Sequence, residues 1–285
     1  MIYLPPQLPL SPLYNQTGLL ASNQICHGEP MRLEDHARGD GLIWRCSNKN
    51  ACRAKRGLRS GSFFEGSKLS ISVNLKMMYF WSFEIDAQAF WERELDVAAP
   101  TIVDWKMFCR DICADYFVNH PVQIGGIGRT VEIDESLLAR RRYNVGHLVR
   151  EQWVFGGFNV EDKIGFLVPV ERRNADTLLP IITDYILPGT TVISDMWGAY
   201  NTLNQLGYQN LTVNHRIHFV DPATHATTNH VENMWQKAKQ GNKRRCGTHR
   251  TMINSYLQEF MWRQRFGGPH AFHNFITHVR ESYPV

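Results

Sequence analysis

The spacing of hydrophobic and polar residues changes twice along the chain. Residues 1–20 are rich in proline, residues 21–66 mix charges, glycines and cysteines, and neither segment has regular hydrophobic spacing. We expect a loose tail followed by a small, loop-rich module. Over residues 67–122, hydrophobic residues recur at helical spacing, which predicts a helical unit. The runs cover 73–85, 88–97 and 101–117, with Thr101 as the expected N-cap of the last.

Helices of this length with a short break between them are typical of a helix-turn-helix unit that binds DNA. A helical linker packed on its neighbour gives the same pattern, so both interpretations stay open.

From residue 123 to 285, the pattern becomes that of one larger domain. The predicted strands cover 130–138, 152–159, 163–170, 190–195 and 211–215. The predicted helices cover 176–187, 198–206, 228–240, 251–266 and 269–279. Consecutive strands followed by alternating helices and strands give a mixed sheet with helices on its faces. The expected fold class is α/β (α+β), with the element order of the ribonuclease H-like fold.

Two acidic residues interrupt strands that are otherwise hydrophobic. Asp134 lies in the middle of the first predicted strand and Asp195 at the end of the fourth. A carboxylate in a buried sheet costs several kcal/mol unless it is paired or bound to a metal. In the expected fold these strands are neighbours, and two adjacent carboxylates need a cation between them. Oxygen ligands favour Mg²⁺ or Mn²⁺.

A third carboxylate comes from the predicted helix 228–240. Glu232 lies beside the hydrophobic stripe of that helix and can point at the edge of the sheet. Lys239 follows two turns later on the same face, where it can contact a DNA phosphate. Three carboxylates holding two ions fit phosphoryl transfer. Taken singly, an aspartate at a strand end is more often a turn residue, and a helical glutamate is more often solvated.

The net charge of +4 does not by itself indicate a nucleic-acid partner. Basic residues nevertheless flank the acidic positions, where they could neutralise phosphates or simply form solvated faces. These residues are Arg140, Arg141, Arg142, Lys237, Lys239, Lys243, Arg244 and Arg245. The sequence has no membrane-spanning stretch and no signal peptide, which predicts a soluble intracellular protein without a membrane partner.

Several segments of the chain resemble the IS1595/ISXO2-like DDE transposases, and most closely the eukaryotic Merlin elements of that group. The segments are VEIDES, RRRYNVG, QWVFGG, TVISDMWGAY, HFVDPATHATTNHVENMWQKAK and LQEFMWR. The resemblance implies a DNA transposase with a metal-binding triad of Asp134, Asp195 and Glu232, and a trailing Lys239. Some bacterial relatives use an asparagine as the third catalytic position, here Asn229. We prefer Glu232, because a carboxylate holds a divalent ion better than an amide does.

The resemblance also implies how such an enzyme works. It uses two Mg²⁺ or Mn²⁺ ions to cleave DNA at terminal inverted repeats and to join the ends to target DNA. It is expected to act as a homo-oligomer and, in a eukaryote, in the nucleus. Two alternatives remain: a domesticated DNA-binding protein without catalysis, and a ribonuclease H-like nuclease.

The segment 40–70 resembles the second half of the zinc ribbon of this family. The expected zinc ligands are Cys46 and Cys52, together with Cys26 and a histidine. His27 is adjacent to Cys26, and adjacent residues seldom bind one ion, so His36 is the preferred histidine. A degenerate ribbon without metal is the alternative.

The remaining candidate ligands are weaker. We interpret Cys109 and Cys113, one helical turn apart, as core residues. A histidine metal site is also conceivable, although such residues more often pack or bind phosphate. Its members would be His215, His218, His225 and His230.

Overall fold

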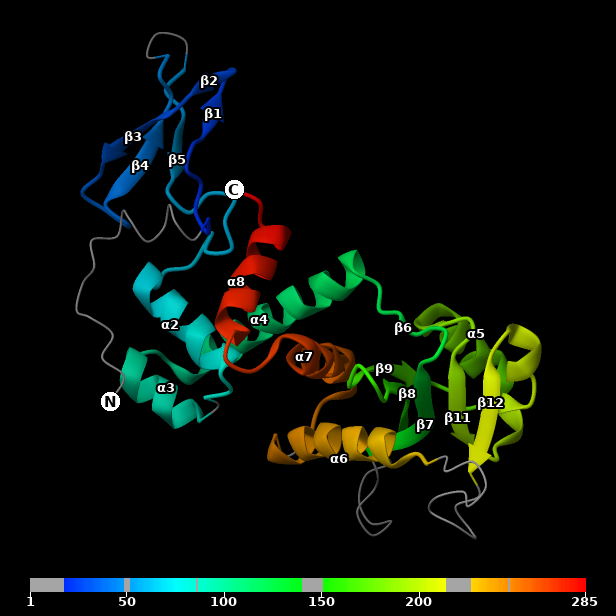
Figure 1. Ribbon diagram of the computed structural model, residues 1–285. Helices are drawn as coiled ribbons and strands as arrows, with labels where there is room; N and C mark the ends of the chain where they lie inside the picture. The colour runs from blue at the N-terminus through cyan, green and yellow to red at the C-terminus, as the bar shows by residue number, and fades with distance from the viewer. Residues whose placement is uncertain (1–17, 49–51, 86, 140–150, 214–226, 246) are drawn as a thin grey trace. The chain divides into compact units, whose positions relative to one another are not determined.

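The computed structural model describes residues 18–48, 52–85, 87–139, 151–213, 227–245 and 247–285. These residues form two compact units (Figure 1). Unit 1 contains the chain up to Tyr116 together with Phe266–Val285, and unit 2 contains Phe117–Arg265. The division into four segments that the sequence suggests remains a prediction.

The first part of unit 1 consists of short antiparallel strands. They are β1 (Ile25–Cys26), β2 (Glu29–Pro30), β3 (Arg32–Asp35), β4 (Leu42–Arg45) and β5 (Lys55–Gly57). Strand β1 pairs with β2, and the other three form a sheet of order β3-β4-β5. His27 and Gly28 join β1 to β2, and both have positive φ angles (54° and 78°). This two-residue connection has the left-handed backbone that a tight hairpin requires.

The rest of unit 1 is helical. Its helices are α2 (Ile71–Ser82), α3 (Gln88–Leu95), α4 (Ala99–Asn119, up to Tyr116) and α8 (Ala271–Ser282). Ser70 caps α2 by accepting the Val73 N–H at 3.2 Å. Helix α8 packs on α2, where the rings of Trp81 and Phe275 lie 4.7 Å apart. Thr101 is inside the first turn of α4 and is not its N-cap, because Pro100 is tolerated in a first helical turn.

Unit 2 is built on a five-stranded mixed sheet. Its strands are β7 (Thr130–Ala139), β8 (Gln152–Asn159), β9 (Ile164–Val170), β11 (Thr191–Asp195) and β12 (Gln209–Val213). Their order is β12-β11-β7-β8-β9, and β7, β8 and β9 are antiparallel, whereas β11 is parallel to both β7 and β12. The mixed sheet and the neighbouring first and fourth predicted strands are therefore confirmed.

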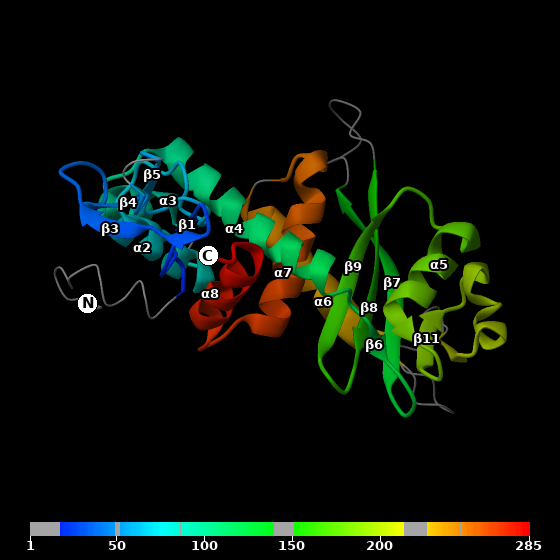
Figure 2. The same cartoon turned by 90° about the horizontal axis from the view of Figure 1, so that it is seen from above.

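Helices cover both faces of this sheet (Figure 2). They are α5 (Ala175–Tyr185), α6 (Asn229–Arg244) and α7 (Ile253–Phe266, up to Arg265). On one face, the ring of Tyr185 in α5 contacts Phe166 at 4.6 Å. On the other face, Trp235 of α6 lies against Gly156 and Met234 lies against Gly165. Because glycine has no side chain, α6 can lie close to the strands at these two points.

Three predicted elements differ from the structure. The helix expected at 198–206 is two short 3₁₀ turns, η1 (Gly198–Tyr200) and η2 (Leu203–Leu206). Glycine and asparagine are weak helix formers, which explains this difference. The helix predicted to reach Leu187 ends at Tyr185, since β10 (Ile186–Leu187) pairs with β6 (Ile124–Gly125). The last strand ends at Val213, and His215 lies outside the described residues.

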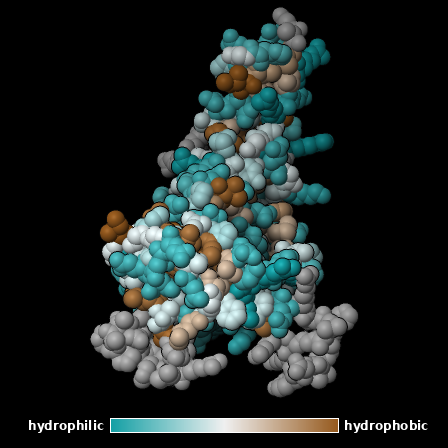
Figure 3. Space-filling model, turned by 90° about the vertical axis from the view of Figure 1, so that its right-hand side faces the viewer, coloured by the Kyte–Doolittle hydropathy of each residue, from teal (hydrophilic) through white to brown (hydrophobic). Residues whose placement is uncertain are grey.

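Hydrophobic side chains on the surface are scattered. On the face that Figure 3 shows, hydrophobic residues lie singly among hydrophilic ones and do not form one broad patch. No helix among the described residues has the length and hydrophobicity that a membrane crossing requires. Hydrophobic residues that are exposed singly in this way are normal on a protein surface.

Candidate functional site

Asp134 and Asp195 are brought together by the register of two parallel strands. Ile193 of β11 pairs with Glu132 of β7. Two residues further along both strands come Asp195 and Asp134, so the register directs both side chains to the same face of the sheet. That face also carries Gly156, the partner of Asp134 on β8, which α6 covers.

The electrostatics of Asp134 reflect this crowding. Burial, followed by the negative charges of Glu135, Asp195 and Glu232, raises the pKa of its carboxyl to about 7. Asp195 accepts the Trp197 backbone N–H at 2.9 Å. The site therefore has an excess of negative charge and only oxygen donors, which fits a hard divalent cation.

Glu232 lies in the first turn of α6 and is exposed. Its Oε1 accepts the hydroxyl of Thr228 at 3.1 Å. The packed face of the helix is formed by Val231, Met234, Trp235 and Ala238, in agreement with the predicted hydrophobic stripe. Glu232 is close enough to Asp134 to raise its pKa, so all three acidic positions contribute to one electrostatic environment.

These three carboxylates are spread more widely than the ligands of one ion. Among the described residues, a single group of three ligating side chains has all its ligand atoms within 4.8 Å of one another, and that group consists of cysteines. The acidic group is therefore more open than that cysteine group.

Glu132 is a residue that the sequence analysis missed. Its side chain is 1% exposed and accepts the backbone N–H groups of His230 at 2.8 Å and Val231 at 2.9 Å. Its other oxygen contacts His230 Nδ1 at 2.6 Å. The first N–H groups of a helix have no partner within the helix, and the N-terminal end of the helix dipole is positive. A carboxylate that accepts these N–H groups is therefore stabilised both by hydrogen bonds and by the dipole. Glu132 thus ties α6 to β7 through the two residues that directly precede Glu232. The signal in the sequence was a second acid in a hydrophobic strand, two residues before Asp134.

Glu135 faces the opposite side of β7 and was also missed. It accepts a hydrogen bond from the hydroxyl of Tyr200. Burial raises its pKa, while the Tyr200 hydrogen bond and the charge of Arg173 act in the other direction. Burial and Glu135 together raise the pKa of Tyr200.

Helix α6 carries the remaining predicted residues of this region. Asn229 is its exposed first residue, and its backbone N–H binds Thr227 Oγ1 at 3.2 Å. Lys239 is half-buried, and Arg245, just after the helix, stacks over the Tyr256 ring at 3.9 Å. The other basic residues at this end are exposed: Lys237, Lys243 and Arg244. The predicted DNA contacts Arg140, Arg141 and Arg142 lie outside the described residues.

His230 has protein partners on two sides. Besides its contact with Glu132, its ring stacks on Phe158 with centroids 6.0 Å apart. It therefore helps to fix the start of α6. The other histidines of the alternative metal site, His215, His218 and His225, lie outside the described residues.

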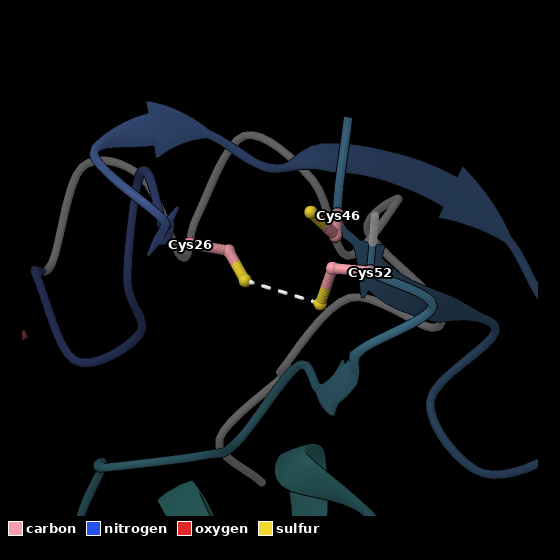
Figure 4. A group of neighbouring side chains, drawn as sticks. All are labelled: Cys26, Cys46 and Cys52. Atoms are coloured by element: carbon pink, nitrogen blue, oxygen red, sulfur yellow. Dashed lines mark hydrogen bonds between the residues drawn. The ribbon is translucent and has the colours of Figure 1, made fainter. Parts of the chain in front are cut away.

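A separate group of three cysteines lies in unit 1 (Figure 4). Cys26, Cys46 and Cys52 point toward one another, and the sulfurs of Cys26 and Cys52 are 3.7 Å apart. The Ala54 backbone N–H and then the His27 side chain lower the pKa of Cys52 to about 7. Burial and the neighbouring cysteines raise the pKa of Cys26 to about 11. Three converging sulfurs fit a soft tetrahedral site.

Neither candidate histidine for the fourth ligand position belongs to this close group among the described residues. The preferred candidate from the sequence, His36, has its Nδ1 3.1 Å from the Arg38 carbonyl oxygen, whereas the His27 side chain is close enough to Cys52 to lower its pKa. Cys109 and Cys113 are buried in α4, which confirms their interpretation as core residues.

Comparison with known proteins bears on unit 2. The profile of the ISXO2-like transposase domain matches residues 128–265. An uncharacterized transposase-like protein of Haemophilus influenzae is 30% identical over 98 residues, which are 34% of this chain and 78% of that protein.

A solved structure is also similar, at a lower level. A chain in the cryo-electron microscopy structure of a simian T-cell lymphotropic virus intasome, in complex with PP2A regulatory subunit B56 gamma, is 12% identical with a TM-score of 0.33. The match covers 66% of this chain and 67% of that one, and at this TM-score it decides nothing about the fold. The profile and the bacterial relative, in contrast, agree on one assignment: the chain belongs to the ISXO2-like transposase family.

Proposed function

We propose that the protein is a DNA transposase that cleaves transposon ends and joins their 3′-hydroxyls to target DNA. The observation that carries this proposal is the register of β7 and β11, which directs Asp134 and Asp195 to one face of the sheet, where the charges of Asp195 and Glu232 act on Asp134. Family membership supports the same chemistry. The sheet order β9-β8-β7-β11-β12 supports a ribonuclease H-like catalytic domain.

The acidic residues are proposed to hold two Mg²⁺ or Mn²⁺ ions. When bound, these ions would activate the attacking water or 3′-hydroxyl and stabilise the leaving oxygen. Asp134 and Asp195 supply oxygen ligands from the rigid sheet, and Glu232 supplies one from α6. Glu132 keeps the start of α6 on β7, so it is a positioning residue for Glu232.

The basic residues of α6 are proposed to bind the DNA backbone. Lys239 follows Glu232 by two turns, and a lysine there can hold a phosphate near the acidic group. Lys237, Lys243 and Arg244 extend this positive charge toward the end of the helix. Because contacts to phosphate carry no sequence information, recognition of the transposon end has to come from elsewhere, and we propose the helical part of unit 1 for it.

The cysteine group is proposed to bind Zn²⁺ through Cys26, Cys46, Cys52 and His27. The sulfurs already converge, and His27 lies close enough to Cys52 to lower its pKa. Such a site stabilises a module too small to form a large core.

Assembly and location complete the proposal. Pairing of two DNA ends calls for a homo-oligomer. A relationship to the Merlin elements would place the enzyme in the nucleus.

The decisive experiment is metal-dependent cleavage of the repeat ends that flank the gene. Wild type should cut and join these ends with Mg²⁺ or Mn²⁺, and Asp195→Ala should lose at least a thousandfold in rate, on the order of 4 kcal/mol of transition-state stabilisation. The matched control is Asp184→Ala, an exposed aspartate on α5, which should cut like wild type. An Asp195→Ala protein with intact activity would exclude the proposed site.

The third catalytic position is tested in the same assay. Glu232→Gln should reduce the rate far more than Asn229→Ala, because only the carboxylate brings negative charge to the site. The opposite order would make Asn229 the third position. Cleavage without joining would favour a nuclease, and binding without cleavage would favour a domesticated DNA-binding protein.

A further inference from the structure

An exposed tryptophan directly follows the acidic site. Trp197 is 47% exposed and the preceding Met196 is 66% exposed. Trp197 comes two residues after Asp195, and its backbone N–H donates to the Asp195 carboxylate at 2.9 Å. Large aromatic side chains are usually well buried, so an indole with half its surface in water beside a charged site calls for an explanation.

The Trp197 indole is held in place and is not a loose surface side chain. Its Nε1–H donates to the carbonyl of Arg173 at 3.0 Å. The guanidinium of Arg173 stacks on the Trp153 ring, with Cζ 3.7 Å from the ring centroid, and lies 5.8 Å from the Trp197 centroid. The three planar groups come from β8, from the segment after β9 and from the segment after β11. This arrangement fixes the orientation of the indole before any ligand arrives.

The fixed orientation determines what the site can recognise. The indole N–H is already satisfied by the Arg173 carbonyl, so the exposed part of Trp197 offers a π-face rather than a hydrogen-bond donor. The adjacent guanidinium adds positive charge and a second planar surface. A flat aromatic ligand attached to a negative backbone fits both features, and an unpaired nucleobase of DNA has this chemistry.

We propose that Trp197, supported by Arg173 and Trp153, stacks an unpaired nucleobase next to the phosphate that is cleaved. This inference rests on the proposed function, because it assigns the base to the DNA strand that enters the acidic site. A base that is unpaired beside the reacting phosphate has lost the stacking of a duplex, and an aromatic surface offsets part of that loss. Because every base has a π-face, the site should accept any base.

The test uses a DNA duplex with a short single-stranded tail, in which 2-aminopurine is the first unpaired base. A blunt duplex with 2-aminopurine in its terminal pair serves as the reference. Binding is measured with EDTA, so cleavage does not contribute. Wild type should quench the fluorescence of the tailed DNA and bind it about tenfold more tightly than the blunt DNA. Trp197→Ala should lose both effects, and Trp197→Phe should keep part of them.

The matched control is Ile127→Ala. Ile127 is 91% exposed in the segment before β7, near Gly189, which precedes β11, so it lies at the other end of these strands from Asp195. This variant should keep the preference for tailed DNA. Thermal unfolding of each variant establishes that the comparison is made on folded protein.

The outcomes separate this inference from the function on which it rests. Wild type that binds neither DNA overturns the proposed function, and this inference with it. Wild type that binds both DNAs equally, without quenching, overturns the stacking site alone. The same holds if Trp197→Ala keeps the preference for the tail. A change of oligomeric state in Trp197→Ala with the tail preference intact would make the indole a protein contact instead.

Discussion

The cysteine group of unit 1 and the acidic group of unit 2 are two candidate metal sites with opposite construction. The three sulfurs come from short strands and turns, and they lie within 4.8 Å of one another. The three carboxylates come from a five-stranded sheet and a 16-residue helix, yet they are spaced more widely. Thiols that keep their protons carry no charge and can approach closely, whereas ionised carboxylates repel one another.

This difference indicates what each ion would do for the fold. The cysteine module has little regular structure, so a bound ion would contribute much of its stability. The acidic group is held in place by the sheet, by Glu132 and by the close packing of α6. Ions bound there would therefore contribute to the proposed reaction rather than to the stability of the fold. The predictions below test this contrast, beginning with the largest expected effect.

Loss of the soft site should unfold its module. Cys46→Ser should abolish zinc binding and remove stabilisation on the order of 10 kcal/mol from residues 18–66, since apparent zinc affinities of such modules are of that size. Zinc content and hydrogen exchange of this segment measure the effect. Cys109→Ala, a buried cysteine of α4, is the control and should keep its zinc. Protein purified without zinc and yet protected over 18–66 would contradict the contrast.

Close packing of α6 on the sheet should contribute measurably to the stability of unit 2. A Cβ at Gly165 would lie 2.5 Å from Met234 Sδ and 2.7 Å from the Gly157 carbonyl oxygen. Gly165→Ala should therefore lower the free energy of unfolding by about 1–3 kcal/mol. Denaturant unfolding measures this change. Gly198→Ala, where the nearest atom is 3.9 Å away, should be close to neutral, and equal losses in both variants would refute the packing argument.

The contact of Glu132 with the start of α6 should affect both the free energy of unfolding and the affinity for metal ions. Glu132→Gln replaces a buried, charge-assisted acceptor and should cost about 1–2 kcal/mol. It should also weaken Mn²⁺ binding, because the start of α6 is no longer fixed. Calorimetric titration with Mn²⁺ measures this second effect. Glu161→Gln is the control, since its exposed carboxylate also accepts a backbone N–H, from Thr130. Unchanged Mn²⁺ affinity in Glu132→Gln would reduce Glu132 to a purely structural residue.

Removal of the Asp134 charge should stabilise the protein in EDTA. The folded pKa of about 7 lies above the ordinary value of 3.8, so the folded state binds this proton more tightly than the unfolded state. Its contribution to stability is therefore greatest at low pH and is lost as the pH rises from about 4 through 7. Because the side chain is partly exposed, we expect Asp134→Asn to gain only about 1 kcal/mol at neutral pH.

Thermal unfolding across pH, with and without Mn²⁺, measures this last effect. Wild type should be stabilised by Mn²⁺ and Asp134→Asn should not. If Asp134→Asn is less stable than wild type in EDTA, the Asp134 carboxylate has a stabilising partner within the protein. The carboxylate would then not be an unpaired charge that a cation neutralises.

Much of unit 2 could be predicted from its hydrophobic pattern. The antiparallel strands β7, β8 and β9 follow their predicted ranges closely, because runs of β-branched and aromatic residues signal strands locally. Pairing of β6 with β10 could not be predicted, since each is only two residues long and depends on the other. Helix α8 was predicted as a helix, but its packing on α2 is a property of distant residues.

The sequence by itself determined that acids interrupt two hydrophobic strands, that a third acid lies beside the hydrophobic stripe of a helix, and that the sheet is mixed. These features have local periods of two or three to four residues, so they can be read from neighbours in the chain. Only the tertiary structure decided that Glu132 accepts the N–H groups at the start of α6 and that Met234 packs against Gly165. The same holds for the hydrogen bond from the Trp197 indole to the Arg173 carbonyl. Glu132 and His230 are 98 positions apart in the sequence. A contact over that separation produces no repeating pattern among neighbouring residues, so it cannot be predicted from the local sequence.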